Sequence, residues 1–580
     1  MNILGISALY HDSASSLVMD GKLIAAAEEE RFSRKKHDSS FPEKSAKYCL
    51  GEGGISAKDL DYIVFYEKPL LKFERLLSQH LQMFPHSFPS FAKAIPSWMT
   101  EKLRIPSLVR TKLGYDGEIL YMEHHMSHAA SAFLVSPFEE AAIITTDGLG
   151  EWTSTTYGYG QGNDINLKKE IHFPSSLGLL YSTVTAHLGF SVNNSEYKVM
   201  GLAAYGVPRM VDKFEKLMDI KVDGSFEMDM DYFDYHYKLS MPSKTFIELF
   251  GPTRKAETEV TQKHKDEAAS LQKVTENILI KIANHVHDET GFDNLVMAGG
   301  VALNSVANGK ILSNTPFKDI WIQPAASDAG GSVGAAFYIY NTMLGNKRTY
   351  VMDNAYHGPS YSGKQIEAWL KTMDIIYSSA EDENDLVLRT AQLIFEDNVV
   401  GWFQGRMEWG PRALGSRSIL SNPANPEMQE ILNLKVKHRE KFRPFAPVVC
   451  EDDALTYFEC DEPVPAPTDF MLMVYPIKKE WHKKIPAVTH VDGSGRLQTI
   501  RRNQNPTYYD LIKKFGDLSG IPILINTSFN IRGEPIVCRP EEAYRCMMGT
   551  GIDYLVMDRF IISREDNPKD MWDSESIAKD

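Results

Sequence analysis

Two histidines, His124 and His128, are the first residues whose spacing suggests chemistry. Side chains four residues apart lie on one face of a helix, with β-carbons about 6 Å apart. This spacing suits one metal ion held by two imidazoles. Asp147 follows in an acidic, glycine-rich turn at the end of a strand-like run and is a candidate third ligand. The alternative is a core helix in which hydrogen bonds satisfy both histidines.

Asp328 lies in a later run of small residues, at positions 324–332, which is expected to open a helix. It can cap the N-terminus of that helix, or it can be a fourth metal ligand. The neighbouring glycines, Gly330 and Gly331, indicate a closely approached site and favour the ligand role. Two histidines and two aspartates leave open positions on Fe²⁺, Mn²⁺ or Zn²⁺, and this donor set does not choose among the three metals.

Two glycine-containing turns are candidates for binding the phosphates of a nucleotide. One turn surrounds Asp147, and the other follows the strand-like residues 295–298. Glycine lets the backbone approach a ligand closely, and a helix N-terminus offers free N–H groups to an anion. The candidate nucleotide-binding residues are Gly148, Gly150, Gly299, Gly300 and Asn304.

His11 and Asp12 lie together in a polar turn after the first strand-like run. A histidine near a metal can act as general base toward a hydroxyl group. Its alternative role is a structural contact in the turn or at a helix cap, and both roles stay open. His11 and Asp12 are therefore the candidate catalytic residues.

The C-terminal third of the chain carries clusters of arginine and lysine interleaved with glycine, at positions 401–420 and 435–443. Arginine binds phosphate or carboxylate bidentately, so cations gathered in an acidic protein predict a pocket for an anion. The alternative for the run at 435–443 is a solvated face paired with glutamates. The candidate residues for binding a phosphorylated substrate are Arg412, Lys441, Arg443, Arg501, Asn526, Ser528 and Asn530.

Composition excludes several classes of protein. The net charge is −15, and a general binder of nucleic acid would need a basic face, so no nucleic-acid partner is expected. Five cysteines without a Cys-x-x-Cys pair indicate a reducing compartment. The first residues are already strand-like, and no apolar run reaches the length of a membrane span. We therefore expect a cytoplasmic protein without a membrane segment.

Strand patterns position these residues and repeat along the chain. Strands are expected at residues 2–7, 14–19 and 22–27, and again at 141–146, 152–159 and 166–172, with an Asp in the first turn of each set. This duplication resembles the ASKHA superfold of actin, sugar kinases and heat-shock chaperones. A long helix is expected within residues 256–288. Turn-rich residues at 345–365 divide the chain into domains at 1–355 and 356–580.

Several long motifs resemble the O-carbamoyltransferases that decorate nodulation factors and antibiotics. They occupy residues 11–15, 27–37, 124–132, 147–151, 196–203, 409–415 and 441–447, so the resemblance spans essentially the whole chain. It implies an α/β protein with a duplicated ASKHA N-terminal domain and a YrdC-like C-terminal domain. The sequences 441–443 and 528–530 are similar to the Lys-x-Arg and Ser-x-Asn signatures of YrdC-type threonylcarbamoyl-AMP synthases.

The resemblance also implies a reaction in two steps. Carbamoyl phosphate and ATP, with Mg²⁺, give carbamoyl-adenylate in the C-terminal domain. The carbamoyl group then moves to the hydroxyl of a small-molecule acceptor at the metal of the N-terminal domain. The resemblance favours Fe²⁺ as that metal, and a homodimer is left open.

Three other functions are compatible with parts of this pattern. An ASKHA-type small-molecule kinase would need neither the second basic domain nor the histidine pair. A tRNA threonylcarbamoyl transferase would need a basic face for tRNA, which the net charge disfavours. A non-catalytic nucleotide-binding protein would not need metal ligands together with two anion sites.

Overall fold

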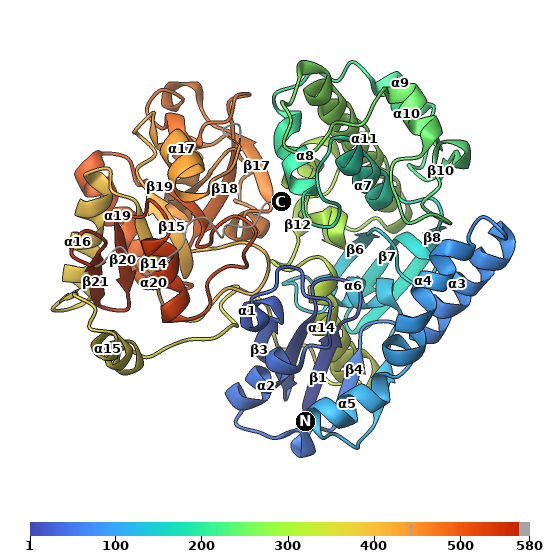
Figure 1. The fold of residues 1–580 in the computed structure, drawn as a ribbon, viewed down its shortest axis with the longest axis horizontal. Coiled ribbons are helices and arrows are strands. Elements are labelled where there is room, and N and C mark those ends of the chain that lie inside the picture. Colours follow the sequence, from blue (N-terminus) through green and yellow to red (C-terminus); the bar gives the residue numbers. More distant parts are fainter. Residues whose placement is uncertain (441–442, 568–580) are drawn as a thin grey trace. The chain divides into compact units, whose positions relative to one another are not determined.

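The computed structural model describes residues 1–440 and 443–567 of the chain, which form two compact units (Figure 1). The first unit contains Met1–Glu29 and His37–Met352, and the second contains Glu30–Lys36 and the chain from Asp353 onward. The predicted boundary after residue 355 lies close to the observed one, but Glu30–Lys36 belongs to the second unit, which the prediction did not include. Arg34 explains this assignment, because its guanidinium donates to the carbonyl oxygens of Pro535 and Ile536 at 2.8 and 2.7 Å.

The first sheet of unit 1 is a meander extended by two parallel strands. Its order is β3-β2-β1-β4-β5, with β1–β2 and β2–β3 antiparallel and β1–β4 and β4–β5 parallel. Asp20 and Gly21 form the β2–β3 turn with φ of 47° and 76°, the conformation that a tight two-residue hairpin requires. The strands are β1 (Asn2–Ser7), β2 (Ala14–Met19), β3 (Lys22–Glu28), β4 (Tyr62–Phe65) and β5 (Ile119–Tyr121).

The second sheet repeats the topology of the first. Its order is β8-β7-β6-β11-β12, again with two antiparallel pairs followed by two parallel pairs. The strands are β6 (Glu140–Thr146), β7 (Thr153–Gln161), β8 (Asp164–His172), β11 (Asn294–Ala298) and β12 (Asp319–Trp321). The predicted duplication and fold class are therefore confirmed.

Two helices of small residues pack inside unit 1. α6 (His124–Phe133) lies against α14 (Asp328–Phe337), and α14 also lies against β1. A side chain at Gly334 would come within 2.0 Å of the Ser127 carbonyl oxygen, so the glycine permits this close approach. The runs of Ala, Gly and Ser in both helices are thus packing requirements.

The long helix α11 (Gln262–Thr290) begins six residues later than the start of the predicted range. Thr261 occupies its N-cap, and Gly291 ends it in the left-handed conformation with φ of 68°. The other α-helices of unit 1 are α2 (Glu43–Glu52), α3 (Pro69–Met83), α4 (Phe88–Ser97), α5 (Ile105–Leu113), α7 (Leu177–His187), α8 (Glu196–Ala203), α9 (Val211–Glu215), α10 (Lys244–Phe250), α12 (Ser305–Asn308) and α13 (Ile311–Asn314). The small hairpin is β9 (Met218–Ile220) and β10 (Phe226–Met228).

Unit 2 is built on a nine-stranded mixed sheet of order β13-β21-β20-β14-β15-β19-β16-β18-β17. The strands are β13 (Ser378–Ser379), β14 (Val400–Phe403), β15 (Arg417–Ser421), β16 (Ala446–Cys450), β17 (Met473–Pro476), β18 (Ser494–Ile500), β19 (Ile523–Ser528), β20 (Tyr554–Met557) and β21 (Phe560–Ser563). Strands β14, β15 and β16 are buried along their whole length, as expected of a sheet covered on both faces.

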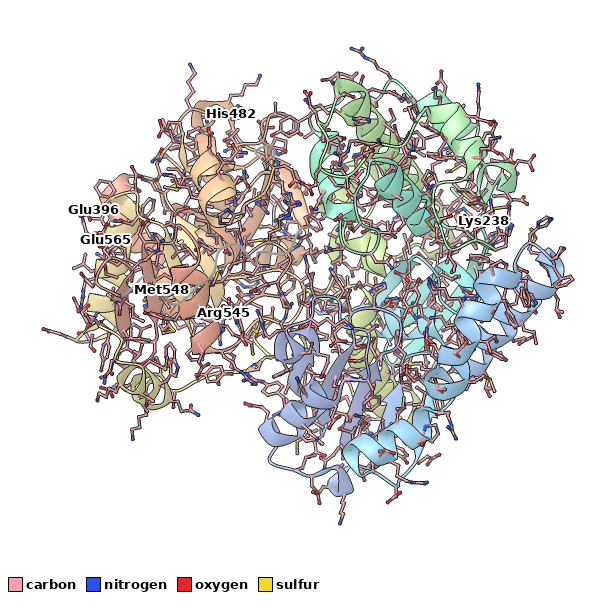
Figure 2. The ribbon with its side chains drawn as sticks, in the orientation of Figure 1. Lys238, Glu396, His482, Arg545, Met548 and Glu565 are labelled. Carbon is pink, nitrogen blue, oxygen red and sulfur yellow. The ribbon has the colours of Figure 1, made fainter. Side chains whose placement is uncertain are left out.

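Helices cover this sheet with their apolar faces. Leu386 and Ile394 of α16 and Leu511 and Phe515 of α19 share one core with the central strands. On α20, Met548 is buried, whereas Arg545 on the outer side pairs with Glu534 at 3.1 Å (Figure 2). The helices are α1 (Glu30–Ser33), α15 (Gly363–Thr372), α16 (Glu383–Phe395), α17 (Met428–Ile431), α18 (Glu451–Tyr457), α19 (Pro506–Ser519) and α20 (Pro540–Met548). Among residues 1–440 and 443–567, no helix has the length and apolar character needed to cross a bilayer.

Candidate metal centre and anion site

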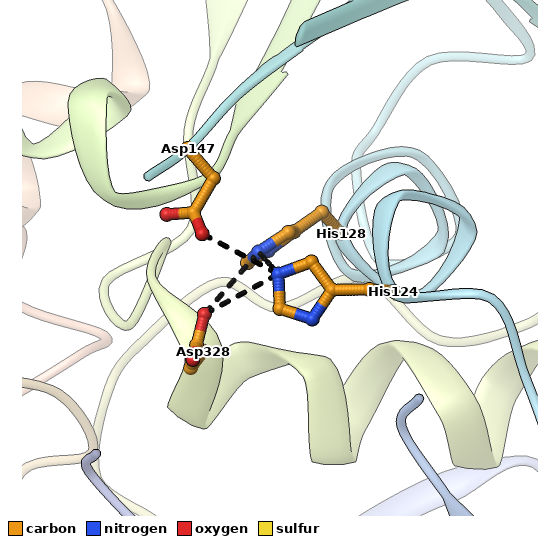
Figure 3. A group of neighbouring side chains, drawn as sticks. All are labelled: His124, His128, Asp147 and Asp328. Atoms are coloured by element: carbon orange, nitrogen blue, oxygen red, sulfur yellow. Dashed lines mark hydrogen bonds and ion pairs between the residues drawn. The ribbon is translucent and has the colours of Figure 1, made fainter. Parts of the chain in front are cut away.

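Helix α6, the end of β6 and the first turn of α14 bring four side chains together (Figure 3). Nε2 of His124 lies 3.1 Å from Nε2 of His128 and 3.4 Å from Oδ2 of Asp147. Oδ1 of Asp328 lies 3.5 Å from Nε2 of each histidine. One ligand atom from each residue lies within 4.8 Å of the others, and all four residues are buried. The structure thus assembles all four predicted metal ligands.

The backbone fixes the orientation of this cluster. Oδ1 of Asp147 accepts a hydrogen bond of 2.7 Å from the Gly300 backbone N–H, which leaves Oδ2 facing His124. Both carboxylate oxygens of Glu151 accept from the His124 backbone N–H, at 3.2 and 3.1 Å, at the start of α6. Carboxylates near a helix N-terminus are stabilised by its free N–H groups and dipole.

Asp328 does not act as a helix cap. Ser327 occupies the N-cap of α14, and Asp328 is fully buried as the first helical residue. Neither of its carboxylate oxygens has a hydrogen-bond partner within the described parts of the chain, and the same holds for Nδ1 of His124 and His128. Asp328 is therefore not the N-cap residue, and each histidine has contacts at Nε2 but no hydrogen bond at Nδ1 within the described residues. A buried carboxylate without partners is costly, and a cation between the four side chains would remove that cost.

The electrostatics of the cluster also favour a cation. Burial raises the pKa of Asp147, but the adjacent His124 and His128 outweigh burial and hold that pKa well below its ordinary range. Burial likewise raises the pKa of Asp328, and the nearby histidines bring it below its ordinary value. For His124, burial lowers the pKa, and the two carboxylates outweigh burial and raise it. Positive charge on the imidazoles thus compensates the carboxylates, a role that a metal ion can take over.

His11 lies at the edge of this cluster. Its Nε2 is 3.8 Å from Oδ2 of Asp328, and its Nδ1 is 3.0 Å from Oδ2 of Asp12. The other oxygen of Asp12 contacts Nδ1 of His37 at 2.7 Å, so Asp12 orients two imidazoles. Burial lowers the pKa of His11, but Asp328 and Asp12 outweigh burial and raise that pKa to about 10. The sequence analysis did not select His37 as a site residue.

The predicted nucleotide-binding glycines lie around Asp147. Gly299 has a φ of 95°, and a side chain there would come within 2.2 Å of the Thr146 carbonyl oxygen. Gly150 also faces α6, because an added Cβ would lie 3.1 Å from Cβ of His124. Gly148 follows Asp147 directly, and its carbonyl accepts from the Ser176 hydroxyl at 2.7 Å. These glycines allow the strand ends to meet at the cluster, and their contact with a nucleotide stays a prediction.

The turn after β11 differs from the expected strand–turn–helix element. Gly300–Leu303 is a single 3₁₀ turn, and the following helix α12 has four residues. The Asn304 side chain caps α12 by accepting from the Ala307 N–H at 3.1 Å, and it exchanges hydrogen bonds with Gln272 of α11. The N–H of Gly300 is already bonded to Asp147, so it positions the cluster.

Three buried charged residues near the cluster, Glu67, Lys72 and Arg75, were not predicted. Oε2 of Glu67 lies 3.9 Å from Nδ1 of His124 and 2.6 Å from Nζ of Lys72. Arg75, one turn further along α3, donates to the Gly150 carbonyl oxygen at 3.0 Å. The available sequence signal was a pair of cations three residues apart in a leucine-rich helix.

In unit 2, Lys437 lies on the Ser528–Asn530 segment. Its Nζ donates to Oδ1 of Asn530 at 2.9 Å, to Oγ of Ser528 at 3.3 Å, and to the Ser528 carbonyl oxygen. Burial lowers the pKa of Lys437 well below its ordinary range, and the nearby cations Arg439, Lys36 and Arg443 lower it further. Crowded cations beside hydroxyl and amide groups suit an anion. Lys437 was part of the basic run but was not selected, and the selected Lys441 lies outside the described residues.

Arg443, Arg501 and Asn526, which were also predicted to bind an anion, each contact other residues than Lys437 does. Nε of Arg443 pairs with Oε2 of Glu440 at 2.8 Å. Arg501 pairs with Asp469 at 2.9 Å, and burial raises the pKa of Asp469 to about 6 although Arg501 opposes that rise. Asn526 donates to the Ala413 carbonyl oxygen at 3.1 Å, so it supports the loop that carries Arg412.

Glu408 also supports the loop that carries Arg412, and it was not among the predicted site residues. One oxygen of its buried carboxylate accepts from the backbone N–H groups of Leu414, Ser416 and Arg417, at 2.8, 2.7 and 3.1 Å. Arg417 itself is buried and donates to the carbonyl oxygens of Gln404 and Ser416, so its role is structural.

Comparisons with known proteins cover most of the chain. Residues 2–337 match the family described as carbamoyltransferase N-terminus, and residues 391–564 match carbamoyltransferase C-terminus. Nodulation protein NolNO of Sinorhizobium fredii is 37% identical over 98% of this chain and 81% of its own length. Nodulation protein NolO of Bradyrhizobium diazoefficiens is 36% identical over 79% of this chain and 81% of its own length.

Solved structures are similar mainly to part of the chain. HypF of T. kodakarensis aligns with a TM-score of 0.32 and 15% identity over 58% of this chain and 48% of its own. The ROK hexokinase of Thermus thermophilus aligns with a TM-score of 0.28 and 14% identity over 58% of this chain and 98% of its own. At these TM-scores the likeness adds nothing to the topology described above.

Proposed function

Because the chain belongs to the carbamoyltransferase family and is an enzyme of that class, we propose that it carbamoylates a hydroxyl group in two ATP-dependent steps. The observation that carries this proposal is the buried His₂Asp₂ cluster of unit 1. In unit 2, Lys437 contacts the Ser528–Asn530 segment, and Arg439, Lys36 and Arg443 lie nearby. Two chemically distinct sites fit an activation step and a transfer step.

The first step belongs to unit 2. Water releases inorganic phosphate from carbamoyl phosphate and leaves carbamate. A carbamate oxygen then attacks the α-phosphorus of ATP, which is bound with Mg²⁺, and pyrophosphate leaves with carbamoyl-adenylate as the other product. Lys437, Arg443 and the Ser528–Asn530 segment bind the phosphates, and the loop with Arg412 and the Arg501 region complete the site. Charge-assisted hydrogen bonds from arginine and lysine stabilise such anions.

The second step belongs to unit 1. The acceptor oxygen attacks the carbamoyl carbon, AMP leaves, and the hydroxyl proton passes to a base. His11 is the proposed base, and Asp12 fixes its orientation through Nδ1. Asp328 is one cause of the raised pKa of His11, and a cation that neutralised Asp328 would oppose that rise. Gly148, Gly150, Gly299, Gly300 and Asn304 line the nucleotide side of this site.

His124, His128, Asp147 and Asp328 would hold the metal. Their nitrogen and oxygen donors fit Fe²⁺, which the family favours, and also Mn²⁺ or Zn²⁺. A metal held there would supply Lewis-acid polarisation of the carbonyl group. Asp147 and Asp328 additionally stabilise it by their negative charge.

The proposal is tested with the full chain, ATP and carbamoyl phosphate. We expect pyrophosphate release without an acceptor, and AMP plus a carbamoylated product, seen by mass spectrometry, when polyols or sugars are added. Formation of ADP and a phosphorylated acceptor would instead identify a kinase. A strict requirement for tRNA and threonine would identify a threonylcarbamoyl transferase.

His128→Ala separates the two steps. Because His128 lies in the metal cluster, transfer to the acceptor should be lost, whereas pyrophosphate release should persist at close to the unmodified rate. His172→Ala, an exposed change on β8, serves as the matched control and should alter neither step. Equal loss of both activities in His128→Ala would contradict the assignment of one step to each unit.

A further inference from the structure

The two nitrogens of the His124 ring face different groups. Nε2 points into the metal cluster, and the dashed lines of Figure 3 reach His124 only at this atom. Nδ1 is buried and has no hydrogen-bond partner within the described residues. It faces the carboxylate of Glu67, whose Oε2 lies 3.9 Å away. A histidine that binds a metal through one nitrogen normally donates its other N–H to an acceptor, so an acceptor is expected at Nδ1.

Packing fixes the direction of the His124 ring. The centre of the Tyr66 ring lies 5.3 Å from that of His124, and a Cβ added at Gly150 would lie 3.1 Å from Cδ2 of His124. Tyr66 is itself held, because its backbone N–H donates to the Ile6 carbonyl oxygen at 3.0 Å. A rotation of the His124 ring out of its plane would bring it against Tyr66 or the turn at Gly150. The edge of the ring that carries Nδ1 therefore stays on the side of Glu67.

Glu67 is a buried residue just after the end of β4, and its side chain is held in place by α3. Its Oε2 accepts a hydrogen bond of 2.6 Å from Nζ of Lys72. Lys72 is also buried, and its Nζ lies 4.6 Å from the centre of the Tyr10 ring. An ionised carboxylate has about four lone-pair sites, so Glu67 can accept from Nδ1–H of His124 while the bond to Lys72 persists.

We propose that Glu67 is a positioning residue of the metal centre, which accepts a hydrogen bond from Nδ1–H of His124 and so directs Nε2 to the cation. This bond selects the tautomer whose free lone pair is on Nε2, and the negative charge makes the imidazole a stronger ligand. The 3.9 Å separation exceeds a hydrogen bond, so the two side chains must close that gap when the cation is bound. The inference rests on the metal centre of the proposed function and adds a residue outside its four ligands.

Competition between the full-length protein and a chelator for Co²⁺ tests the role of Glu67, and the absorption spectrum of bound Co²⁺ reports its ligands. Glu67→Gln should weaken Co²⁺ binding by about tenfold to a hundredfold, because the amide lacks the negative charge. Glu67→Asp keeps the charge and should recover part of the affinity. Glu74→Gln, an exposed change on α3, is the matched control and should bind Co²⁺ like the unmodified protein.

A double variant separates the metal centre from the stability of the fold. Glu67→Gln leaves Lys72 buried without its anion, which is destabilising by itself. Glu67→Gln combined with Lys72→Gln removes both charges and leaves two amides that can hydrogen-bond to each other. We expect this double variant to unfold near the temperature of the unmodified protein and still to bind Co²⁺ roughly tenfold or more weakly. Pyrophosphate release, which is assigned to unit 2, should be unchanged in the single and the double variant.

The outcomes distinguish failure of this inference from failure of the proposed function. If Asp328→Asn and the unmodified protein bind Co²⁺ equally, the metal centre itself is wrong, and the role of Glu67 is wrong with it. If Asp328→Asn loses Co²⁺ but Glu67→Gln keeps the affinity and spectrum of the unmodified protein, the metal centre stands and Glu67 does not position it. Normal Co²⁺ binding by the double variant would assign the loss in Glu67→Gln to the unpaired Lys72, which also overturns the proposal.

Discussion

Asp147 and Asp328 face the same two imidazoles but are held differently. Asp147 is anchored by the Gly300 N–H, whereas neither oxygen of Asp328 has a hydrogen-bond partner in the described parts of the chain. Asp328 therefore depends most on a cation. We expect Asp328→Asn and Asp147→Asn each to lower bound metal to a small fraction of one ion per chain, because a carboxamide lacks the ligand charge.

Metal analysis of the purified variants checks this expectation. Asp288→Asn changes an exposed carboxylate on α11 and should leave the metal content unchanged. Undiminished metal in Asp147→Asn would remove Asp147 from the ligand set, and the same reasoning applies separately to Asp328.

Arg443 is expected to bind a phosphate of carbamoyl phosphate, and its replacement should weaken that binding. Losing one charge-assisted contact to a phosphate should weaken binding by about 1.5–3 kcal/mol, or roughly tenfold to a hundredfold. Arg443→Ala should therefore raise the carbamoyl phosphate concentration needed for pyrophosphate release. Arg443→Lys should rescue only part of the loss, because an ammonium group cannot make the bidentate fork.

Two controls accompany the Arg443 variants. Arg502→Ala removes an exposed arginine paired with Asp510 and should behave like the unmodified protein. Preformed carbamoyl-adenylate should restore transfer in Arg443→Ala, since unit 1 is untouched. Transfer that stays absent under those conditions would assign Arg443 to the second step or to folding.

At the scale of elements, the loop between Glu408 and β15 is fixed by hydrogen bonds to its backbone N–H groups and to its carbonyl oxygens. Glu408 accepts three backbone N–H groups of the loop, and Asn526 and Gln498 donate to its carbonyl oxygens. Glu408→Gln should weaken these hydrogen bonds and loosen the position of Arg412. The expected result is a higher KM for carbamoyl phosphate and a lower thermal midpoint, with bound metal unchanged.

The matched control is Glu396→Gln, an exposed change at the end of α16 (Figure 2). Steady-state kinetics should show no effect of this control on KM. A Glu408→Gln protein with normal KM would mean that the loop is not part of the carbamoyl phosphate site.

Helices α7 and α11 share a buried pair that should make stability depend on pH. Oε1 of Glu267 lies 3.6 Å from Nε2 of His187. Burial raises the pKa of Glu267 to about 8, although Lys263 and Lys213 oppose it, and burial lowers the pKa of His187 to about 4. Both groups are therefore neutral together near pH 7.

The sign of the effect differs between the two groups. The raised pKa of Glu267 contributes stability that is present below its ordinary value of 4.5 and is lost as pH rises through about 8. The lowered pKa of His187 contributes stability above 6.5 that is lost as pH falls through about 4. Glu267→Gln should remove this loss, which accumulates between about pH 4.5 and about pH 8 and is on the order of a few kcal/mol.

Urea unfolding of Glu267→Gln and of the unmodified protein, below pH 4.5 and above pH 8, measures how much the free energy of unfolding of each changes with pH. Glu289→Gln, at an exposed position near the end of α11, should keep the pH dependence of the unmodified protein. If Glu267→Gln loses as much stability between about pH 4.5 and about pH 8 as the unmodified protein, other groups cause the loss.

At the scale of the molecule, duplication of a sheet explains where the metal centre forms. β1–β2 and β6–β7 occupy equivalent places in sheets of the same strand order. The turn after β1 carries His11 and Asp12, and the turn after β6 carries Asp147. The two turns meet Asp328 and α6, so one centre receives residues from both repeats.

Much of unit 1 was predictable from the sequence because its signals are short-range. Strand alternation and turns such as Asp20–Gly21 depend on neighbouring residues, and they gave the strands of both meanders. The spacing of His124 and His128 likewise depends only on helix geometry. Sequence patterns alone thus indicated the duplicated fold and the four side chains that the structure brings together.

Other features depend on which elements pack together, and no local pattern contains that information. Lys437 is one of several cations in a basic run of the sequence, and its contact with the Ser528–Asn530 segment comes from the tertiary structure. The inward direction of Arg75 on α3 depends on the carbonyl oxygen of Gly150, which lies 75 residues further along the chain. Side-chain periodicity specifies an element and its faces, but the partner of each face is decided by tertiary contacts between distant residues.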